Sequence, residues 1–263
     1  MKYVFFSLLC SAAVLMTSPI VSCGCRESAS VIVRTVEEIR LEKINRIDTA
    51  SISEVLRPDT IAGWVELSRL SAEAWMLVED SSGLLISAKN VDKRMYPASL
   101  TKMMTCLLAL EQGNMGDTIV IKREDYVTRD AWVKPGDRYE MGNLVTEMML
   151  LSDNVAAVAL ANHLGSDTLS FLEMMNKKAA YLGLDSTRFA NPNGMPCDSN
   201  YTTARDLMAL TRYCLCDTAF AHIVATPFAD VPLADDRHFP CQNRNQLLAD
   251  YAGCIGVKTG YAA

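Results

Sequence analysis

Three short polar motifs, each placed where an apolar segment begins or ends, constrain most strongly how this 263-residue chain can fold. The first, Ser99–Lys102 (Ser-Leu-Thr-Lys), opens an apolar helical run. The second, Ser152–Asn154 (Ser-Asp-Asn), lies between two apolar helical stretches, and the third, Lys258–Gly260 (Lys-Thr-Gly), follows an apolar segment. Each of the two tripeptides has a chance expectation of about 0.05 in such a chain at average residue frequencies. Their joint occurrence, in this order and on three different elements, therefore argues against coincidence.

The first motif has the residue types that nucleophilic catalysis needs. Residues three apart on a helix share a face, so Lys102 can reach the Ser99 hydroxyl. Amides at a helix N-terminus carry partial positive charge and can stabilise an oxyanion. One turn can thus supply a nucleophile, an amine base and an oxyanion-binding amide. Taken alone, the spacing is weak, since about one such pair is expected by chance, and a helix cap plus a surface lysine is the alternative.

The other two motifs offer polar groups for substrate binding. By itself, Ser152–Asn154 is most simply a connection with local caps. At the third motif, Gly260 would let the backbone of a ligand approach closely. Lys258 and Thr259 would offer a charge and a hydroxyl to a carboxylate.

The N-terminus has the pattern of an export signal. Residues 1–3 are weakly positive, and residues 4–16 form an apolar run that is too short to span a bilayer comfortably. We therefore predict a signal peptide over residues 1–22. Ile20–Cys23 resembles the lipobox of bacterial lipoproteins, which implies that Cys23 is acylated. An ordinary cleavable signal with an incidental Cys23 is the alternative, and either pattern predicts export.

Beyond the signal, residues 23–71 are charge-mixed and poor in aromatic residues, which indicates a tether or helical spacer. The folded domain is predicted over 72–263, beginning with a hairpin over 75–88 that turns at Ser81–Gly83. Helices are predicted over residues 100–111, 144–151, 155–164, 170–182 and 204–216.

Local signals set some of the element boundaries. Gly165 and Gly183 are predicted to end helices, and Thr203–Asp206 is predicted to form a capping box. The segment 255–258 is predicted to be a strand.

Composition narrows the function classes. Half of the residues are hydrophobic and 21% are charged, as in a globular protein, and the net charge of −6 disfavours nucleic acid as a partner. The three histidines lack zinc-hydrolase spacing, so no metal or other cofactor is expected. Among the nine cysteines, Cys106 is predicted to be a buried hydrophobe. Cys214 and Cys216, two apart on a helix, should not pair with each other. Some of the other cysteines are expected to form disulfides in an oxidising compartment.

With their flanks, these motifs resemble the low-molecular-weight D-alanyl-D-alanine carboxypeptidases, the DacA-type penicillin-binding proteins of peptidase family S11. The resemblance is carried by residues 97–105 (PASLTKMMT), 189–194 (FANPNG), 203–207 (TARDL) and 256–261 (GVKTGY). It runs from about residue 72 to the end of the chain. It implies an α/β (α+β) fold of the serine β-lactamase/DD-peptidase type, with an antiparallel sheet flanked by helices and a helical lobe.

The resemblance also implies a reaction. Ser99 would attack the carbonyl between the two terminal D-alanines of a peptidoglycan stem peptide, and water would hydrolyse the acyl-enzyme. Lys102 would accept the serine proton as a neutral amine, its pKa lowered by burial and by the nearby Lys258. Ser152 would relay a proton to the leaving D-alanine. β-Lactams would acylate Ser99 as mimics of the substrate.

Substrate contacts follow from the same resemblance. Asn154 would hold the substrate amide, while Lys258 and Thr259, beside Gly260, would receive the terminal carboxylate. The backbone amides of Ser99 and Tyr261 would hold the oxyanion. The implied partners are stem peptides, β-lactams and, through Cys23, the membrane. The implied location is the bacterial cell envelope or periplasm, as a membrane-anchored lipoprotein.

Three alternatives remain. A class A β-lactamase needs a Glu-x-x-Leu-Asn stretch, whereas Glu173–Asn176 has the wrong spacing and lies in a helical run. A D,D-endopeptidase would use the same machinery. A truncated, non-catalytic envelope lipoprotein is the third, because the family continues into further strands and a C-terminal helix after Lys-Thr-Gly. We accordingly expect an unpaired sheet edge, with an incomplete sequence as the simplest explanation.

Overall fold

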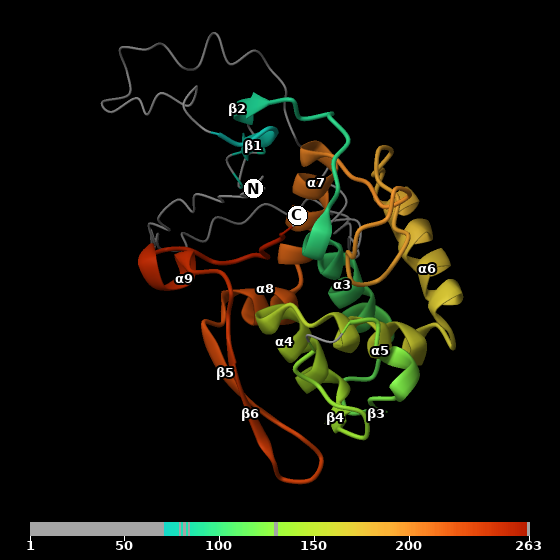
Figure 1. Ribbon diagram of the computed structural model, residues 1–263. Coiled ribbons are helices and arrows are strands. Elements are labelled where there is room, and N and C mark those ends of the chain that lie inside the picture. Colours follow the sequence, from blue (N-terminus) through green and yellow to red (C-terminus); the bar gives the residue numbers. More distant parts are fainter. Residues whose placement is uncertain (1–70, 79, 81–82, 84, 129–130, 262–263) are drawn as a thin grey trace, which may run out of the picture.

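The computed structural model describes residues 71–78, 80, 83, 85–128 and 131–261 (Figure 1). The predicted signal peptide over 1–22, the lipidation site Cys23 and nearly all of the predicted tether over 23–71 lie outside these described residues.

The described chain begins with the predicted hairpin. Strand β1 (Trp75–Val78) pairs antiparallel with β2 (Leu85–Lys89), so that Trp75 faces Lys89 and the register shifts near Val78. Alternate β1 residues are buried, as expected for a strand with one covered face. The buried residues Ala74, Met76 and Val78 pack with Ala204 and Met208 of a later helix.

The five predicted helices are confirmed, with ends that differ by up to three residues. They are α3 (Lys102–Gln112), α4 (Met141–Leu151), α5 (Asn154–Leu164), α6 (Thr168–Tyr181) and α7 (Ala204–Leu215). Gly165 caps α5, and Gly183 follows α6 in a left-handed conformation with φ of +69°. The Thr203 hydroxyl accepts a hydrogen bond from the Asp206 amide and so caps α7, which is half of the predicted capping box.

Several short elements were not predicted. They are the 3₁₀ turns η2 (Ala98–Thr101) and η3 (Arg123–Asp125), the helices α8 (Thr218–Ala225) and α9 (Leu247–Asp250), and the hairpins of β3 (Thr118–Val120) with β4 (Arg138–Glu140) and β5 (Phe228–Pro232) with β6 (His238–Gln242). Strands of three residues contain too little alternation to be recognised. Antiparallel strand pairs beside helices confirm the predicted α/β class.

The prediction of a strand over 255–258 is wrong. These residues have no strand assignment, because none of the strands in the described part of the chain forms a hydrogen-bonded ladder with them. The segment instead runs toward the start of α3 (Figure 1).

Helix α3 lies at the centre of the core and positions the first motif. It packs against α4, α5 and α7, and its residues from Lys102 to Ala109 are all buried. Helix α5 contributes several alanines to the same core. The serine and lysine of the first motif are thus held at the start of a helix that is closely packed in the core. No helix of the described residues is long and apolar enough to cross a membrane.

Six described cysteines are free, which contradicts the expectation of disulfides among them. Cys106 is fully buried on α3, as predicted, and Cys214 on α7 is also fully buried. Burial raises the pKa of both thiols, so they remain protonated and unreactive. Cys214 and Cys216 do not pair with each other, as their helical spacing predicts.

Candidate active site

The Ser99 turn begins the site. Ser99 lies half-buried in η2, directly before α3, and the amide of Leu100 donates a hydrogen bond to the Pro97 carbonyl oxygen at 3.1 Å. Lys102 Nζ lies 3.2 Å from Ser99 Oγ. The predicted contact between the serine and the lysine one turn later is therefore present.

The Lys102 amine joins three segments of the chain. Besides Ser99, it donates to Asn154 Oδ1 at 2.7 Å and to the carbonyl oxygen of Asn193 at 2.6 Å. The side chain is fully buried. The first two motifs therefore meet at one nitrogen atom, together with a loop that the sequence analysis noted only as a flank.

That loop, residues 189–194, is held tightly against the Ser99 turn. Thr105 Oγ1 donates to the Pro192 carbonyl oxygen at 2.6 Å, and the Gly194 amide donates to Asn191 Oδ1 at 2.6 Å. Gly194 has φ of +83°, and a Cβ there would lie 1.8 Å from the Ala98 carbonyl oxygen. Only glycine fits. The Asn-Pro-Asn-Gly composition was the available signal, because it is typical of a tight turn.

In the second motif, the middle residue has a local role and the last residue reaches the site. Asp153 caps α5 by accepting hydrogen bonds from the amides of Val155 at 2.7 Å and Ala156 at 3.0 Å. Its other oxygen accepts from the Trp132 amide at 2.6 Å. The interpretation of this motif as a connection with local caps therefore holds for Asp153, whereas Asn154 contacts Lys102. Ser152 is half-buried and ends α4 in a left-handed conformation with φ of +62°.

The third motif crosses the Ser99 turn. A Cβ at Gly260 would lie 3.2 Å from Leu100 Cγ and 3.3 Å from the Pro97 carbonyl oxygen, so the close approach that this glycine permits is to the turn itself. Lys258 is buried, and its Nζ donates to the Thr259 carbonyl oxygen at 3.0 Å. Tyr261 is exposed.

The electrostatics of the site favour a neutral Lys102. Burial lowers the pKa of Lys102 to about 7, opposed by the carboxyl groups of Asp153 and Glu147 and assisted by the cation of Arg244. Burial also lowers the pKa of Lys258 well below its ordinary value, with further lowering by Lys102 and Arg244. Burial has the largest effect on each lysine. Lys102 lowers the pKa of Lys258, whereas the cation that lowers the pKa of Lys102 is Arg244 and not the predicted Lys258.

Arg244 is a functional candidate that the sequence analysis missed. It is exposed, and it follows β6 in a segment tied to α4 because its amide donates to the Leu150 carbonyl oxygen at 3.1 Å. Its neighbour Asn243 donates from the carboxamide to the Thr226 carbonyl oxygen at 2.9 Å. A lone arginine between two asparagines has no distinctive sequence pattern, so nothing pointed to this position.

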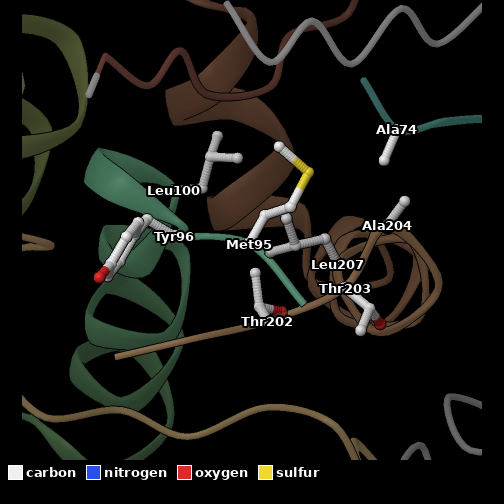
Figure 2. A pocket seen from close by; sticks show the side chains of 8 residues that line it. All are labelled: Ala74, Met95, Tyr96, Leu100, Thr202, Thr203, Ala204 and Leu207. Carbon is white, nitrogen blue, oxygen red and sulfur yellow. The ribbon is translucent and has the colours of Figure 1, made fainter. Parts of the chain in front are cut away.

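A small cavity lies next to the Ser99 turn. Leu100, Tyr96 and Met95 line one side, and Thr202 and Leu207 line the side toward α7 (Figure 2). Its volume of about 20 Å³ has room for about one water molecule. The cavity is therefore too small to hold a peptide.

The β-lactamase alternative finds no support at Glu173–Asn176. Glu173 is exposed on α6, where its carboxylate lies 3.8 Å from Lys177 Nζ. Asn176 binds the backbone of Phe189, donating to its carbonyl oxygen at 2.8 Å and accepting from its amide at 3.0 Å. The contacts of Glu173 and Asn176 are therefore those of residues with a structural role on α6.

Residues 62–263 match the family model described as D-alanyl-D-alanine carboxypeptidase, Peptidase_S11. The chain is 34% identical over 204 residues to D-alanyl-D-alanine carboxypeptidase DacB2 of Mycobacterium tuberculosis, covering 76% of this chain and 69% of that protein. It is 30% identical to DacF of Bacillus subtilis, over 72% of this chain. The chain spans about half the length of DacF, 51%.

The fold is similar to that of solved penicillin-binding proteins. A crystal structure of an evolved penicillin-binding protein homolog from Mycobacterium tuberculosis superimposes with a TM-score of 0.70 and 33% sequence identity. The match covers 76% of this chain and 77% of that chain. The fold class therefore rests on sequence and structure together.

Proposed function

This chain belongs to the D-alanyl-D-alanine carboxypeptidases of peptidase family S11, and we propose that it removes the terminal D-alanine from peptidoglycan stem peptides by serine catalysis. One observation carries the proposal: a fully buried lysine amine lies 3.2 Å from a half-buried serine hydroxyl. A lysine with a pKa of about 7 is substantially neutral at neutral pH and can act as a base.

The hydrogen bonds of Lys102 orient its lone pair. A neutral amine has two N–H donors and one lone pair, and the carbonyl oxygens of Asn154 and Asn193 can only accept. The two shorter bonds, at 2.7 Å and 2.6 Å, use both donors. The lone pair is then left for the Ser99 hydroxyl, which becomes the donor. This arrangement prepares the serine for deprotonation.

Acylation follows from this geometry. Ser99 Oγ forms a bond to the carbonyl carbon between the two D-alanines as its proton passes to Lys102 Nζ. The negative charge on the carbonyl oxygen is held by the amides of Ser99 and Tyr261. Collapse of the tetrahedral intermediate breaks the peptide bond, and the proton returns through Ser152 to the amine of the leaving D-alanine. Water then hydrolyses the acyl-enzyme with Lys102 again as base.

Positive charge around the turn suits a substrate that ends in a carboxylate. Thr259 and Gly260 lie beside Lys258 along the Ser99 turn, and Arg244 adds a cation near both lysines. A carboxylate bound there would gain charge-assisted hydrogen bonds. Asn154 would hold the substrate amide through its carboxamide. β-Lactams, which carry a carboxylate beside a strained amide, would acylate Ser99 by the same route.

Labelling with a fluorescent penicillin tests the proposal. The wild-type chain should become covalently labelled and should release D-alanine from a pentapeptide. Ser99→Ala and Lys102→Ala should do neither, whereas Ser87→Ala, a matched change on β2, should behave like wild type. A folded wild-type chain that is not labelled, or labelling of Ser99→Ala, would contradict the proposal. Comparing turnover of a pentapeptide with that of a cross-linked muropeptide separates carboxypeptidase from endopeptidase action.

We further propose that the protein acts in the bacterial cell envelope, anchored through a lipid on Cys23. The apolar run over 4–16 and the lipobox-like Ile20–Cys23 support export and acylation. Expression with an alkyne fatty acid should label the wild-type chain and Cys25→Ser but not Cys23→Ser. Equal labelling of both variants would exclude Cys23 as the acylated residue.

A further inference from the structure

Glu147 on α4 is a buried acid that the proposed reaction does not use. It is fully buried, and neither carboxylate oxygen has a hydrogen-bond partner among the described residues. Buried polar groups are nearly always hydrogen-bonded, because an unpaired one loses its hydration without compensation. An apolar side chain at this position of a largely apolar helix would avoid that cost. The position of Glu147 therefore calls for a functional explanation.

The surroundings of Glu147 connect it to the catalytic lysine. Helix α4 is capped by Ser152, five residues after Glu147. It packs against α3, which begins with Lys102, and against α5, which begins with Asn154. Lys102 and Glu147 are both completely shielded from solvent in this packed region. Charges in such a medium interact more strongly than charges in water.

The charged and titratable groups around Glu147 come from several elements. Burial raises the pKa of Glu147 well above its ordinary value, and Asp153 raises it further, whereas Lys102 and Arg244 lower it. Glu147 in turn raises the pKa of Lys102, and it acts in the same direction on Tyr139 of β4 and Cys241 of β6. Glu147 and Lys102 thus affect each other's protonation in both directions.

We propose that Glu147 is a positioning residue whose buried, unpartnered carboxyl group acts electrostatically on Lys102, and thereby sets the fraction of Lys102 that is a neutral base. This inference rests on the proposed function. When Glu147 and Lys102 together hold one proton, they exist in one of two forms of equal net charge, a carboxylic acid with a neutral amine or a carboxylate with an ammonium. A carboxylic acid beside an amine leaves Lys102 able to accept the Ser99 proton. A carboxylate beside an ammonium does not.

Glu147 also favours the protonated state that follows the attack by Ser99. When the Ser99 proton reaches Lys102, the new ammonium stands in a buried site where charge is disfavoured. A carboxyl group close by can stabilise that ammonium by its dipole or, when ionised, by its charge. Glu147 acts through Lys102 and contacts neither substrate nor acyl group.

The variant Glu147→Gln tests the proposal, since glutamine has nearly the same shape and cannot ionise. The readout is the acylation rate with penicillin across the range from about pH 5 to about pH 9. The wild-type rate should fall on the acidic side with a midpoint near the Lys102 pKa of about 7. Loss of the carboxylate should move this midpoint lower by about one pH unit, which is about tenfold faster acylation on the falling part of the profile.

Met148→Leu is the matched control, because Met148 is the next residue of α4, is equally buried and does not titrate. Its profile should coincide with that of wild type. If Glu147→Gln folds, as shown by thermal unfolding, and its midpoint equals that of wild type and Met148→Leu, Glu147 has only a structural role and the proposal is overturned.

A second measurement covers the case in which Glu147→Gln does not fold. Carbon-13 spectra of the glutamate carboxyl groups in the wild-type chain should contain one resonance that titrates far above the ordinary glutamate range and shifts higher still in Lys102→Ala. If every glutamate resonance titrates in the ordinary range, or if none responds to Lys102→Ala, the proposal is overturned. A wild-type chain that is never acylated contradicts the proposed function instead, and the spectra still decide on Glu147.

Discussion

Asn154 Oδ1 accepts a hydrogen bond from Lys102 Nζ at 2.7 Å, so two motifs that are 52 residues apart in the chain meet at one buried amine. The contact uses one of the two donors of a neutral lysine and thereby directs its lone pair. Lys102, the proposed base for Ser99, is therefore oriented by the second motif as well as by its own helix.

Asn154→Asp should slow acylation at neutral pH. A carboxylate 2.7 Å from Nζ would favour the ammonium form and raise the pKa of Lys102 above about 7. We expect a fall of about tenfold or more in the acylation rate at pH 7, recovering as the pH rises. Stopped-flow acylation with a chromogenic β-lactam measures this. Asn143→Asp on α4, whose carboxamide binds the Pro232 carbonyl oxygen, is the control. A uniform loss of rate at every pH would show that Asn154 does not act through Lys102.

Gly194→Ala should destabilise the fold and disturb the Ser99 turn. A Cβ at Gly194 would lie 1.8 Å from the Ala98 carbonyl oxygen, so the loop or the turn must move. Gly183→Ala is a matched control, because Gly183 also has positive φ but has nothing within 4 Å of its Cβ. The control should cost only the left-handed strain of about 1 kcal/mol. Urea denaturation should show a clearly larger loss for Gly194→Ala, together with slower acylation. Equal losses for the two variants would contradict this account.

The parts of the site that could be predicted from the sequence are those that depend on residues close together in the chain. The spacing of Ser99 and Lys102 on a single helix turn was sufficient to predict their contact. Gly165 marked the end of α5 and Thr203 the start of α7, because glycine and threonine are residue types typical of these cap positions. The long helices α3 to α7 were recognisable because their apolar stretches are long enough to show periodicity.

The remaining parts depend on contacts between distant segments. The carbonyl oxygen of Asn193 carries no side-chain signature, and Arg244 acts through its charge from an exposed loop. Likewise, 255–258 has the apolar composition of a strand, but strand assignment requires a hydrogen-bonded neighbour. Glu147 resembled any other acid within a helix until its complete burial was visible.

The stability of the protein should depend on pH through Lys102. Its folded-state pKa of about 7 lies below the ordinary value of 10.5, so the unfolded chain binds more protons between these two values. The free energy of unfolding therefore gains a contribution that rises with pH across this window, at up to about 1.4 kcal/mol per pH unit. Lys102→Met removes that contribution, so wild type should gain stability relative to the variant from pH 7 toward pH 10. Urea denaturation at several pH values measures it, and a difference independent of pH would exclude a lowered pKa.

Arg244→Gln should weaken the preference for substrates that end in a carboxylate. The guanidinium lies close enough to lower the pKa of both Lys102 and Lys258, which places positive charge where the terminal carboxylate is proposed to bind. Loss of one charge-assisted hydrogen bond costs about 1.5 to 3 kcal/mol, or about tenfold or more in binding. The ratio of kcat/KM for a peptide ending in D-Ala-D-Ala to that for its C-terminal amide should fall by this factor.

Two further readouts separate carboxylate binding from a general disturbance of the site. Removing the Arg244 cation should raise the pKa of Lys102, so the acidic limb of the acylation profile should move to higher pH. Arg237→Gln on the β5–β6 hairpin is the control, since that guanidinium contacts Asp137 at 2.7 Å and Asp235 at 2.9 Å. Arg237→Gln should leave unchanged both the kcat/KM ratio between the acid and amide peptides and the acidic limb of the acylation profile. If Arg244→Gln shifts the limb but preserves the ratio, Arg244 tunes the lysines without binding the carboxylate, and Lys258 and Thr259 must recognise it alone.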